Sequence, residues 1–299
     1  MARMSCSCMS ICAQTLCMAF NMIVTLEQIL AQAEAGGYAV GLFNMLNLET
    51  ARGIIRAAEQ ERSPLILGVA EVHLPYIHFE YAAMIMNKMA KTATVPVCLH
   101  FDHGVDFEKI QAAVQAGFSS VMYDGSALSY EQNIENTMAV CKMAHAAGCS
   151  VEAELGRVGG AESGDGHVEE EYTNVEQVRD FVARTGIDAL AVAIGTAHGN
   201  YTKTPVLDID RLAQIYRVCE KPLVLHGGSG LSDRDFKNTV KNGIRKVNIC
   251  TELCNAAHLA YCQAKQENIC FEQSVNMAVE AVAQVVANKM RLFGSSGRA

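Results

Sequence analysis

The chain has 299 residues, of which 50% are hydrophobic and 19% charged, and its 32 Asp and Glu outnumber its 24 Lys and Arg, giving a formal net charge of −8 at pH 7. This is the composition of a soluble globular protein, and since no run of Lys or Arg exceeds two residues, it excludes the basic stripe of a nucleic-acid-binding protein. The 12 cysteines form no Cys-x-x-Cys pair, so we expect reduced thiols and a cytoplasmic location rather than a disulfide framework.

Residues 1–21 precede the first predicted element. No charged side chain lies between Met4 and Leu26, but Ser, Gln, Thr and Asn interrupt the apolar character, so the stretch is a poor match to a membrane-spanning helix or a signal peptide. Thr25 and Gln28 then have the spacing of a helix capping box. We predict a disordered or non-native extension over residues 1–21, with a targeting segment as the alternative, a single domain over residues 22–299, and no membrane partner.

Short aliphatic runs alternate with amphipathic segments after this point, which indicates repeated βα units. The eight predicted strands are residues 38–44, 64–70, 95–101, 119–123, 150–155, 189–194, 223–226 and 246–249. The predicted helices are residues 48–60, with Asn47 as N-cap, 107–116, 133–147, 175–185, 209–218, 233–242 and 274–292. Eight mostly apolar strands predict an α/β fold of the (β/α)₈ TIM barrel type, and the absence of Gly-x-Gly-x-x-Gly after the first strand disfavours a dinucleotide-binding fold.

Polar residues collect at the carboxyl ends of the predicted strands, where such barrels place their active sites. They are Asn44, the run His100-Phe-Asp102-His103, Asp124, Glu152 and Glu154, His198-Gly199, His226 and Asn248. Three of them, His103, His198 and His226, have the composition of a catalytic zinc site with an open fourth position, in which the metal acts as a Lewis acid. We expect the histidines outside the strand ends to be ordinary helix or loop residues; these are His73, His78, His145, His167 and His258.

Two further segments follow strand ends. The turn Gly227-Gly228-Ser229-Gly230 and residues 248–251 come after the seventh and eighth strands, where barrels bind phosphate through backbone N–H groups, although flexible turns use the same residues. The Gly-rich segment 156–166 contains Glu162 and follows the fifth strand. It is typical of a lid that delivers a general base, with a solvated surface loop as the alternative.

From Met22 to about Gly297 the sequence resembles the class II, zinc-dependent ketose-bisphosphate aldolase family, which includes the fructose- and tagatose-bisphosphate aldolases. The motifs that carry the resemblance are Leu-His-Phe-Asp-His-Gly at 99–104, Val-Glu-Ala-Glu-Leu-Gly at 151–156, Ala-Ile-Gly-Thr-Ala-His-Gly at 193–199, Leu-His-Gly-Gly-Ser at 225–229 and Val-Asn-Ile-Cys-Thr-Glu at 247–252. The resemblance implies the reversible cleavage of a phosphorylated ketose to dihydroxyacetone phosphate and an aldehyde. It also implies a homodimer or homotetramer.

The resemblance assigns roles residue by residue. It places one Zn²⁺ on His103, His198 and His226, with an alternative metal position at Asp124 and Glu154 in some members, and a monovalent cation, Na⁺ or K⁺, near the phosphate turns. Asp102 would take the proton from the hydroxyl that becomes the aldehyde, and Glu162 would handle the proton at the enediolate carbon. The expected substrate-binding residues are Asn44, Gly199, Gly227, Gly228, Ser229, Asn248 and Thr251.

The sequence departs from the family pattern after the second strand. Ala70-Glu71-Val72-His73 stands where bisphosphate-cleaving relatives carry small hydroxyl or Gly residues, and Ala127 replaces a bulkier or polar residue. A carboxylate at Glu71 would repel a distal phosphate. The sugar therefore stays open between a 1,6-bisphosphate and a ketose 1-phosphate.

Three other functions are alternatives to this one. A non-catalytic aldolase-like partner subunit would have a broken metal or acid set, whereas His103, His198, His226, Asp102 and Glu162 are all present. A class I aldolase would use Lys246, which shares strand parity with Asn248, as its Schiff-base amine. A zinc hydrolase would leave the two phosphate-type turns without a role.

Overall fold

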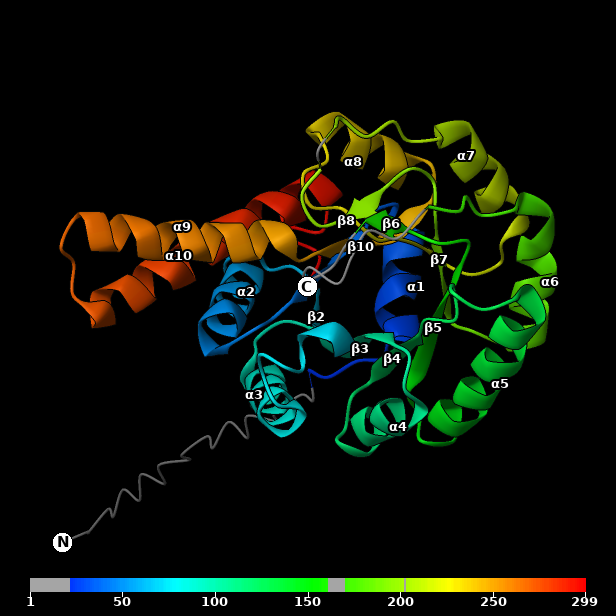
Figure 1. The fold of residues 1–299 in the computed structure, drawn as a ribbon, viewed down its shortest axis with the longest axis horizontal. Coiled ribbons are helices and arrows are strands. Elements are labelled where there is room, and N and C mark those ends of the chain that lie inside the picture. Colours follow the sequence, from blue (N-terminus) through cyan, green and yellow to red (C-terminus); the bar gives the residue numbers. More distant parts are fainter. Residues whose placement is uncertain (1–21, 161–169, 202) are drawn as a thin grey trace, which may run out of the picture.

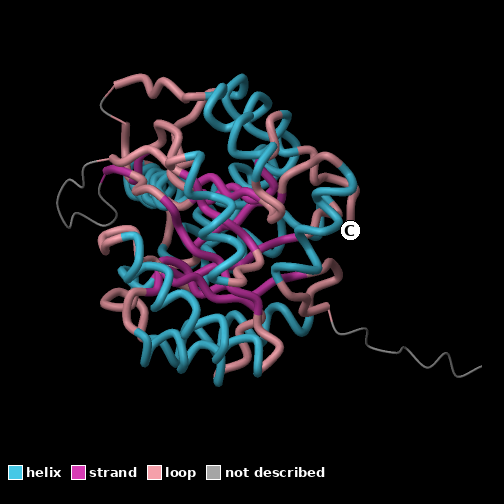
Figure 2. Tube along the Cα trace, turned by 90° about the vertical axis from the view of Figure 1, so that its right-hand side faces the viewer, coloured by secondary structure: helices cyan, strands magenta, loops and turns pink. Residues whose placement is uncertain are grey.

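The protein is described by a computed structural model that covers residues 22–160, 170–201 and 203–299. Eight parallel strands close into a barrel with helices around it (Figures 1 and 2), so the predicted α/β class and TIM-barrel fold are confirmed. The expectations for residues 1–21 and for Glu162 concern residues outside the described ranges.

The barrel strands lie in the order β1-β10-β9-β7-β5-β4-β3-β2. Their bounds are β1 Val40–Asn44, β2 Leu65–Ala70, β3 Val97–Gly104, β4 Ser120–Tyr123, β5 Ser150–Leu155, β7 Ala189–Val192, β9 Leu223–Leu225 and β10 Ile244–Ile249. They are covered on both faces, which explains their near-continuous apolar sequences. Three predicted ends need correction. The strand β3 continues past residue 101 to Gly104, so that Asp102 and His103 lie within it. The strand β7 stops two residues early, and β9 stops at Leu225, so that His226 follows the strand.

The helices follow the predicted pattern, with three additions, of which one is the short 3₁₀ helix η1. They are α1 Leu26–Gly36, α2 Leu48–Glu61, η1 Glu71–His73, α3 Phe79–Thr92, α4 Phe107–Gln115, α5 Tyr130–Ala146, α6 Val175–Thr185, α7 Ile209–Val218, α8 Asp233–Lys241, α9 Thr251–Gln266 and α10 Phe271–Phe293. Neither α3 nor α9 is predicted from the sequence pattern. The start of α9 is predicted only as a phosphate turn, although the segment continues as a helix of 16 residues.

Helix α1 closes the amino-terminal end of the barrel. Its capping box forms as predicted, since the side chain of Thr25 accepts from the backbone N–H of Gln28. The backbone of Val24 pairs with Val97, and that of Glu27 donates to the side chain of Ser150, both at strand starts. The apolar side of α1 packs on a cluster of inward-facing residues that includes Val40, Leu42, Ile66, Cys98 and Val224. The amino-terminal end of the barrel interior is therefore apolar and covered by α1.

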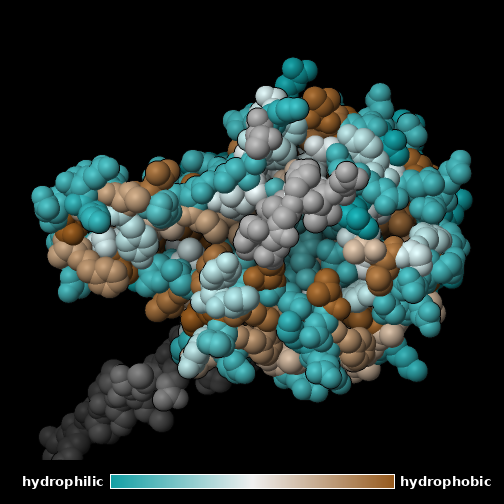
Figure 3. Space-filling view, viewed as in Figure 1, coloured by the Kyte–Doolittle hydropathy of each residue, from teal (hydrophilic) through white to brown (hydrophobic). Residues whose placement is uncertain are grey.

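A second apolar core lies between the strands and the outer helices. Helices α9 and α10 lie side by side and extend away from the barrel (Figure 1), and they expose Leu259 and Phe271. On the face seen in Figure 3, hydrophobic residues are scattered among hydrophilic ones. Within the described residues, no helix combines the length and apolar character needed to cross a membrane.

Candidate metal centre and phosphate site

Neighbouring residues Asp102 and His103 on β3 both belong to the candidate site. In a regular strand they would point to opposite faces. The register between β3 and β4 shifts between Phe101 and Gly104, and His103 has a φ of +47°. A bulge of this kind redirects a side chain, and it leaves Asp102 fully buried while His103 faces the other two histidines. The local distortion of β3 therefore allows the side chains of two neighbouring residues, Asp102 and His103, to belong to the same site.

The structure brings the three predicted metal ligands together. The ring centroid of His103 lies 4.8 Å from that of His198 and 4.5 Å from that of His226. One ring nitrogen of each residue lies within 4.8 Å of the others, and a second such group consists of His103, Asp124 and Glu154. The ligand atoms of the predicted site, and those of the group that contains the alternative position, therefore lie close enough together to bind one ion.

Two short strands hold His198. The backbone of β6 Gly159–Gly160 pairs with that of β8 Ala197–His198 in a parallel ladder outside the barrel. No sequence pattern predicts this ladder, because each strand has only two residues. The ladder connects the loop after β5 to His198, one of the three histidines of the cluster.

Gly160→Ala is expected to weaken zinc binding by about tenfold or more, the loss typical of disturbing a ligand's support. Gly160 has a φ of +96°, and a Cβ there would lie 2.3 Å from the carbonyl oxygen of His198. Gly148→Ala is the matched control, since Gly148 also has a positive φ but a Cβ there would meet nothing within 4 Å. Equal zinc affinities of the two variants in a chelator competition would contradict the role of the ladder.

Carboxylates orient two of the imidazoles. Nδ1 of His103 lies 2.8 Å from Oδ2 of Asp124, and Nε2 of His226 lies 2.8 Å from Oε1 of Glu152. Such partners fix the ring tautomer, so that the opposite nitrogen of each ring would coordinate an ion. Nδ1 of His226 and Oε2 of Glu154 lie 3.5 Å apart, are both buried, and lack a hydrogen-bond partner among the described residues. The donor set and these two atoms fit a bound cation such as Zn²⁺.

Burial controls the charges around this cluster. It lowers the pKa of His226 to about 4, with the neighbouring His103 acting in the same direction. It raises the pKa of Glu154 to about 7, and the nearby charge of Asp124 adds to the effect. His226 is therefore a neutral imidazole near pH 7, which is the form that binds a metal.

Lys246 lies inside the barrel and is fully buried. Its Nζ is 2.8 and 2.9 Å from the two carboxylate oxygens of Glu152, the residue that also contacts His226. Burial alone would raise the pKa of Glu152, but the charge of Lys246 and the hydrogen bond from His226 hold that pKa at about 2. The Lys246 side chain is thus held in an ion pair, whereas a Schiff-base lysine needs a free amine that can attack a carbonyl.

Asp102 is held by two asparagine side chains. Nδ2 of Asn44 donates to its Oδ2 at 2.8 Å, and Nδ2 of Asn248 donates to its Oδ1 at 3.0 Å. Burial alone would raise the pKa of Asp102, but the charge of His103 and the imidazole of His100, 3.6 Å from its Oδ1, hold it well below its usual range. The carboxylate is therefore ionised and fixed in position beside the histidine cluster.

A small cavity of about 20 Å³ lies on one side of the histidines. It is lined by Asn44, His198, Gly199, Gly227, Gly228, Ser229, Asn248, Cys250 and Thr251, which include every substrate-binding residue predicted from the sequence. Oγ of Ser229 accepts from the backbone N–H groups of Cys250 and Glu252 at the start of α9. The cavity thus combines a glycine turn with a helix N-terminus, the arrangement that binds phosphate in many proteins.

Two residues of this region were not predicted individually, although the predicted phosphate segment 248–251 includes one of them. Cys250 precedes α9 and lines the cavity. The hydroxyl of Tyr201 donates to the carbonyl of Gly227 and accepts from the backbone N–H of Ala197, so it joins the β8 segment to the glycine turn. The motif around residue 199 carries no indication of this bridge, because the partners meet only in the folded chain.

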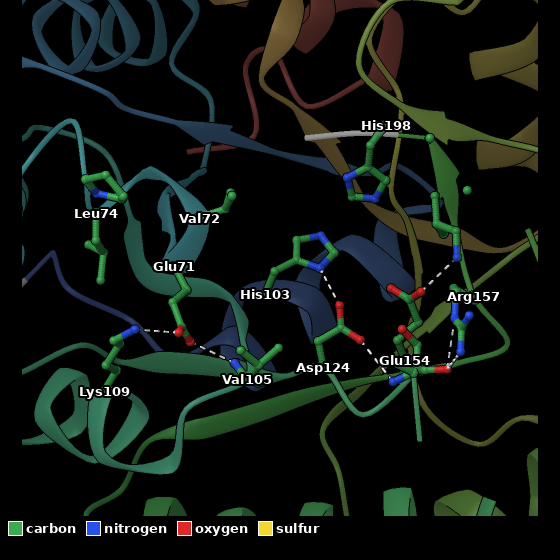
Figure 4. Close-up of a pocket in the computed structure, with 16 residues that line it drawn as sticks. Glu71, Val72, Leu74, His103, Val105, Lys109, Asp124, Glu154, Arg157 and His198 are labelled. Carbon is green, nitrogen blue, oxygen red and sulfur yellow. Dashed lines mark hydrogen bonds and ion pairs between the residues drawn. The ribbon is translucent and has the colours of Figure 1, made fainter. Parts of the chain in front are cut away.

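A larger cavity of about 770 Å³ lies on the other side, next to His103 and His198. Figure 4 shows Glu71 and Lys109 at one side of it and Arg157 at the other, with His103 and Asp124 between them. Leu74, Pro75, Val105 and Val158 give it an apolar lining. The two cavities share His198, so one extended molecule could occupy both and pass the histidine cluster.

The remaining histidines lie outside the cluster, as predicted, except that His167 is not among the described residues. His145 pairs with Asp188 at 2.9 Å, and His258 is exposed on α9. His73 lies in η1, 3.8 Å from the sulfur of Cys250.

Residues 24–298 match the family model described as fructose-bisphosphate aldolase class-II. The fructose-bisphosphate aldolase of Geobacillus stearothermophilus is 39% identical over 290 residues, and this match covers 93% of the chain and 99% of the relative. A protein of Bacillus subtilis named as a probable fructose-bisphosphate aldolase is 40% identical with the same coverage. The crystal structure of the YdjI aldolase from Escherichia coli K12 superposes with a TM-score of 0.84 at 37% identity, covering 93% of this chain and 99% of that one.

Proposed function

Because the chain belongs to the class II fructose-bisphosphate aldolase family, and is therefore an enzyme of the carbon–carbon lyase type, we propose that it uses Zn²⁺ to cleave a phosphorylated ketose reversibly to dihydroxyacetone phosphate and an aldehyde. The observation that carries the proposal is that three imidazoles cluster beside a buried carboxylate, and that one of them, His198, lines both a small phosphate-type cavity and a larger one. Membership of this family also decides against the Schiff-base and hydrolase alternatives.

His103, His198 and His226 would hold the metal. A bound Zn²⁺ would supply a Lewis acid that polarises the ketose carbonyl. Asp124 and Glu152 keep two of the rings in the tautomers that this requires. The buried pair of Lys246 and Glu152 neutralises charge beneath the site without placing a free amine in it.

The small cavity would bind the phosphate of the dihydroxyacetone phosphate half. The turn at Gly227 and Gly228 and the first turn of α9 supply backbone N–H groups, and Ser229 and Thr251 supply hydroxyls. With the phosphate bound there, the carbon chain would run past the histidines toward the larger cavity. The assignment of Asn44, Gly199 and Asn248 to substrate binding is supported by their place in the same lining.

Asp102 would act as the base that takes the proton from the hydroxyl that becomes the aldehyde. Its ionised state and its fixed orientation between Asn44 and Asn248 support this role. The second proton transfer, at the carbon of the dihydroxyacetone phosphate half, is assigned by the family resemblance to Glu162. That residue lies outside the described ranges, so the assignment stays a prediction, as do the monovalent cation and the homodimer or homotetramer.

Chelation is expected to abolish release of dihydroxyacetone phosphate, and added Zn²⁺ is expected to restore it. The test uses fructose and tagatose 1,6-bisphosphates and several ketose 1-phosphates, with release measured before chelation, after it and after metal is returned. Zinc-loaded protein that releases nothing from any of these ketoses would contradict the proposal and favour a non-catalytic partner subunit. Activity that survives complete chelation would contradict the metal requirement alone.

A further inference from the structure

The carboxylate of Glu71 lies at the end of β2, in the wall of the larger cavity, and the residue is only 9% exposed. Its Oε2 accepts from the backbone N–H groups of Val105 at 2.8 Å and Asp106 at 3.1 Å. Its Oε1 accepts from Nζ of Lys109 at 2.8 Å. The sequence predicts only that this acid repels a distal phosphate; in the folded chain its charge is also paired, with one ammonium group and two backbone N–H groups.

The partners of Glu71 are those that an anionic ligand would use. Two consecutive backbone N–H groups at the start of α4 and an ammonium group converge on it. Charge-assisted hydrogen bonds of this kind bind phosphates and carboxylates at helix N-termini. In this chain they are already occupied by a carboxylate of the protein itself.

The Glu71 carboxylate and the proposed substrate would share the larger cavity. One end of the ketose would lie in the small cavity, and the rest would pass His198 into the larger one, where Glu71 and Lys109 form a wall. Figure 4 shows the pair facing the same space as His103. The Glu71 carboxylate therefore lies in the wall of the cavity that the aldehyde half of the substrate would enter.

Arg157 is the second cation in the described lining of this cavity. Its Nε and Nη2 both donate to the carbonyl oxygen of Ser126, at 3.2 and 3.0 Å, so they support the turn after β4. The described lining also contains the acids Glu71, Asp124 and Glu154. The Lys and Arg side chains of the described lining are thus both held by protein groups, and a phosphate dianion that reached Lys109 would meet the carboxylate of Glu71 at close range, which is strongly unfavourable.

We propose that Glu71 takes the place of a distal phosphate, so that the enzyme handles ketose monophosphates whose aldehyde half carries no phosphate. This inference rests on the proposed aldolase function and narrows it to one class of substrate. It makes Glu71 and Lys109 determinants of specificity that do not take part in the chemical step.

The first test measures condensation of dihydroxyacetone phosphate with glyceraldehyde and with glyceraldehyde 3-phosphate by the zinc-loaded enzyme. We expect kcat/KM to favour the uncharged aldehyde by at least about tenfold, since close like charges disfavour the other. An equal or higher value for the phosphorylated aldehyde overturns the inference. Exchange of the C3 proton of dihydroxyacetone phosphate with solvent, measured without any aldehyde, tests the aldolase function separately, and its absence would mean that the proposed function itself has failed.

The second test uses Glu71→Ala, which vacates the donors of Val105, Asp106 and Lys109. We expect its relative kcat/KM for glyceraldehyde 3-phosphate to rise by about tenfold or more, and the double variant with Lys109→Met to lose most of that gain. Glu80→Ala removes an exposed acid from the first turn of α3 and should leave the ratio unchanged. A Glu71→Ala protein that retains proton exchange but keeps the wild-type ratio overturns the inference; if this variant does not fold, the wild-type ratio decides.

Discussion

Replacing Asp102 by asparagine is expected to lower kcat by about 10²–10⁴-fold, the range for removal of a positioned general base, while the protein keeps its zinc. Asparagine has nearly the same shape and keeps one acceptor oxygen, and at the Oδ2 position that oxygen would lie 2.8 Å from Nδ2 of Asn44 and 3.2 Å from Nδ2 of Asn248. What is lost is the ionised oxygen that would accept the substrate proton. The measurement pairs kcat for ketose cleavage with the zinc content per chain.

Asp210→Asn is a suitable control for this substitution. Asp210 is exposed in the first turn of α7, and the same chemical change there should leave kcat and zinc content as they are. If the Asp102 variant turned over normally, proton transfer would have to be assigned to another group. If it lost zinc together with activity, Asp102 would be a support of the metal site rather than the base.

Replacing His198 by alanine is expected to remove both the zinc and the cleavage activity. One of the three imidazoles disappears, and we expect the affinity to fall by more than about 100-fold, the upper end of the losses seen when only the support of a ligand is removed. The backbone of residue 198 would still pair with Gly160, so the fold should be kept. Zinc content after dialysis, cleavage rate and thermal unfolding are measured on the same preparation.

His258→Ala provides the matched loss of an imidazole, because His258 is exposed on α9 and outside the cluster. That variant should retain zinc and activity. Full zinc occupancy with a normal rate in the His198 variant would show that this residue is not a ligand. Together, the Asp102 and His198 variants separate loss of proton transfer from loss of the metal.

Much of the barrel could be predicted because its determinants are local. Strands buried on both faces give short aliphatic runs, and caps such as Thr25 and Asn47 mark helix starts within four residues of sequence. The positions of the three histidines followed from one rule, that barrel strands end at a common face. The predicted substrate-binding residues came from the family resemblance, and all of them line one cavity.

The supporting structure of the site could not be predicted, because it depends on long-range contacts. The bulge that redirects His103 arises from the register between β3 and β4. The pairing of Gly160 with His198 joins two segments whose sequences resemble loops. Lys246 and Glu152 meet across the barrel, 94 residues apart. No local pattern of residue types records any of these contacts.

At Glu71 the sequence reveals the charge but not the groups that pair with it. The sequence rightly marked an unusual acid after the second strand, and the electrostatic argument predicted repulsion. The carboxylate is neutralised by Lys109, which is 38 residues away, and by two backbone N–H groups that no sequence pattern identifies. The charge therefore organises the wall of the cavity rather than only opposing a ligand.

The three imidazoles are held by three separate devices: a bulge for His103, a two-residue ladder for His198, and a carboxylate braced by Lys246 for His226. Each operates between protein groups alone. We therefore expect uptake of an ion to differ from that of a zinc finger, in which binding and folding are one process. Loading and removal would be exchange reactions at a site that is already formed, and the choice among divalent metals would depend on ligand type, geometry and supply.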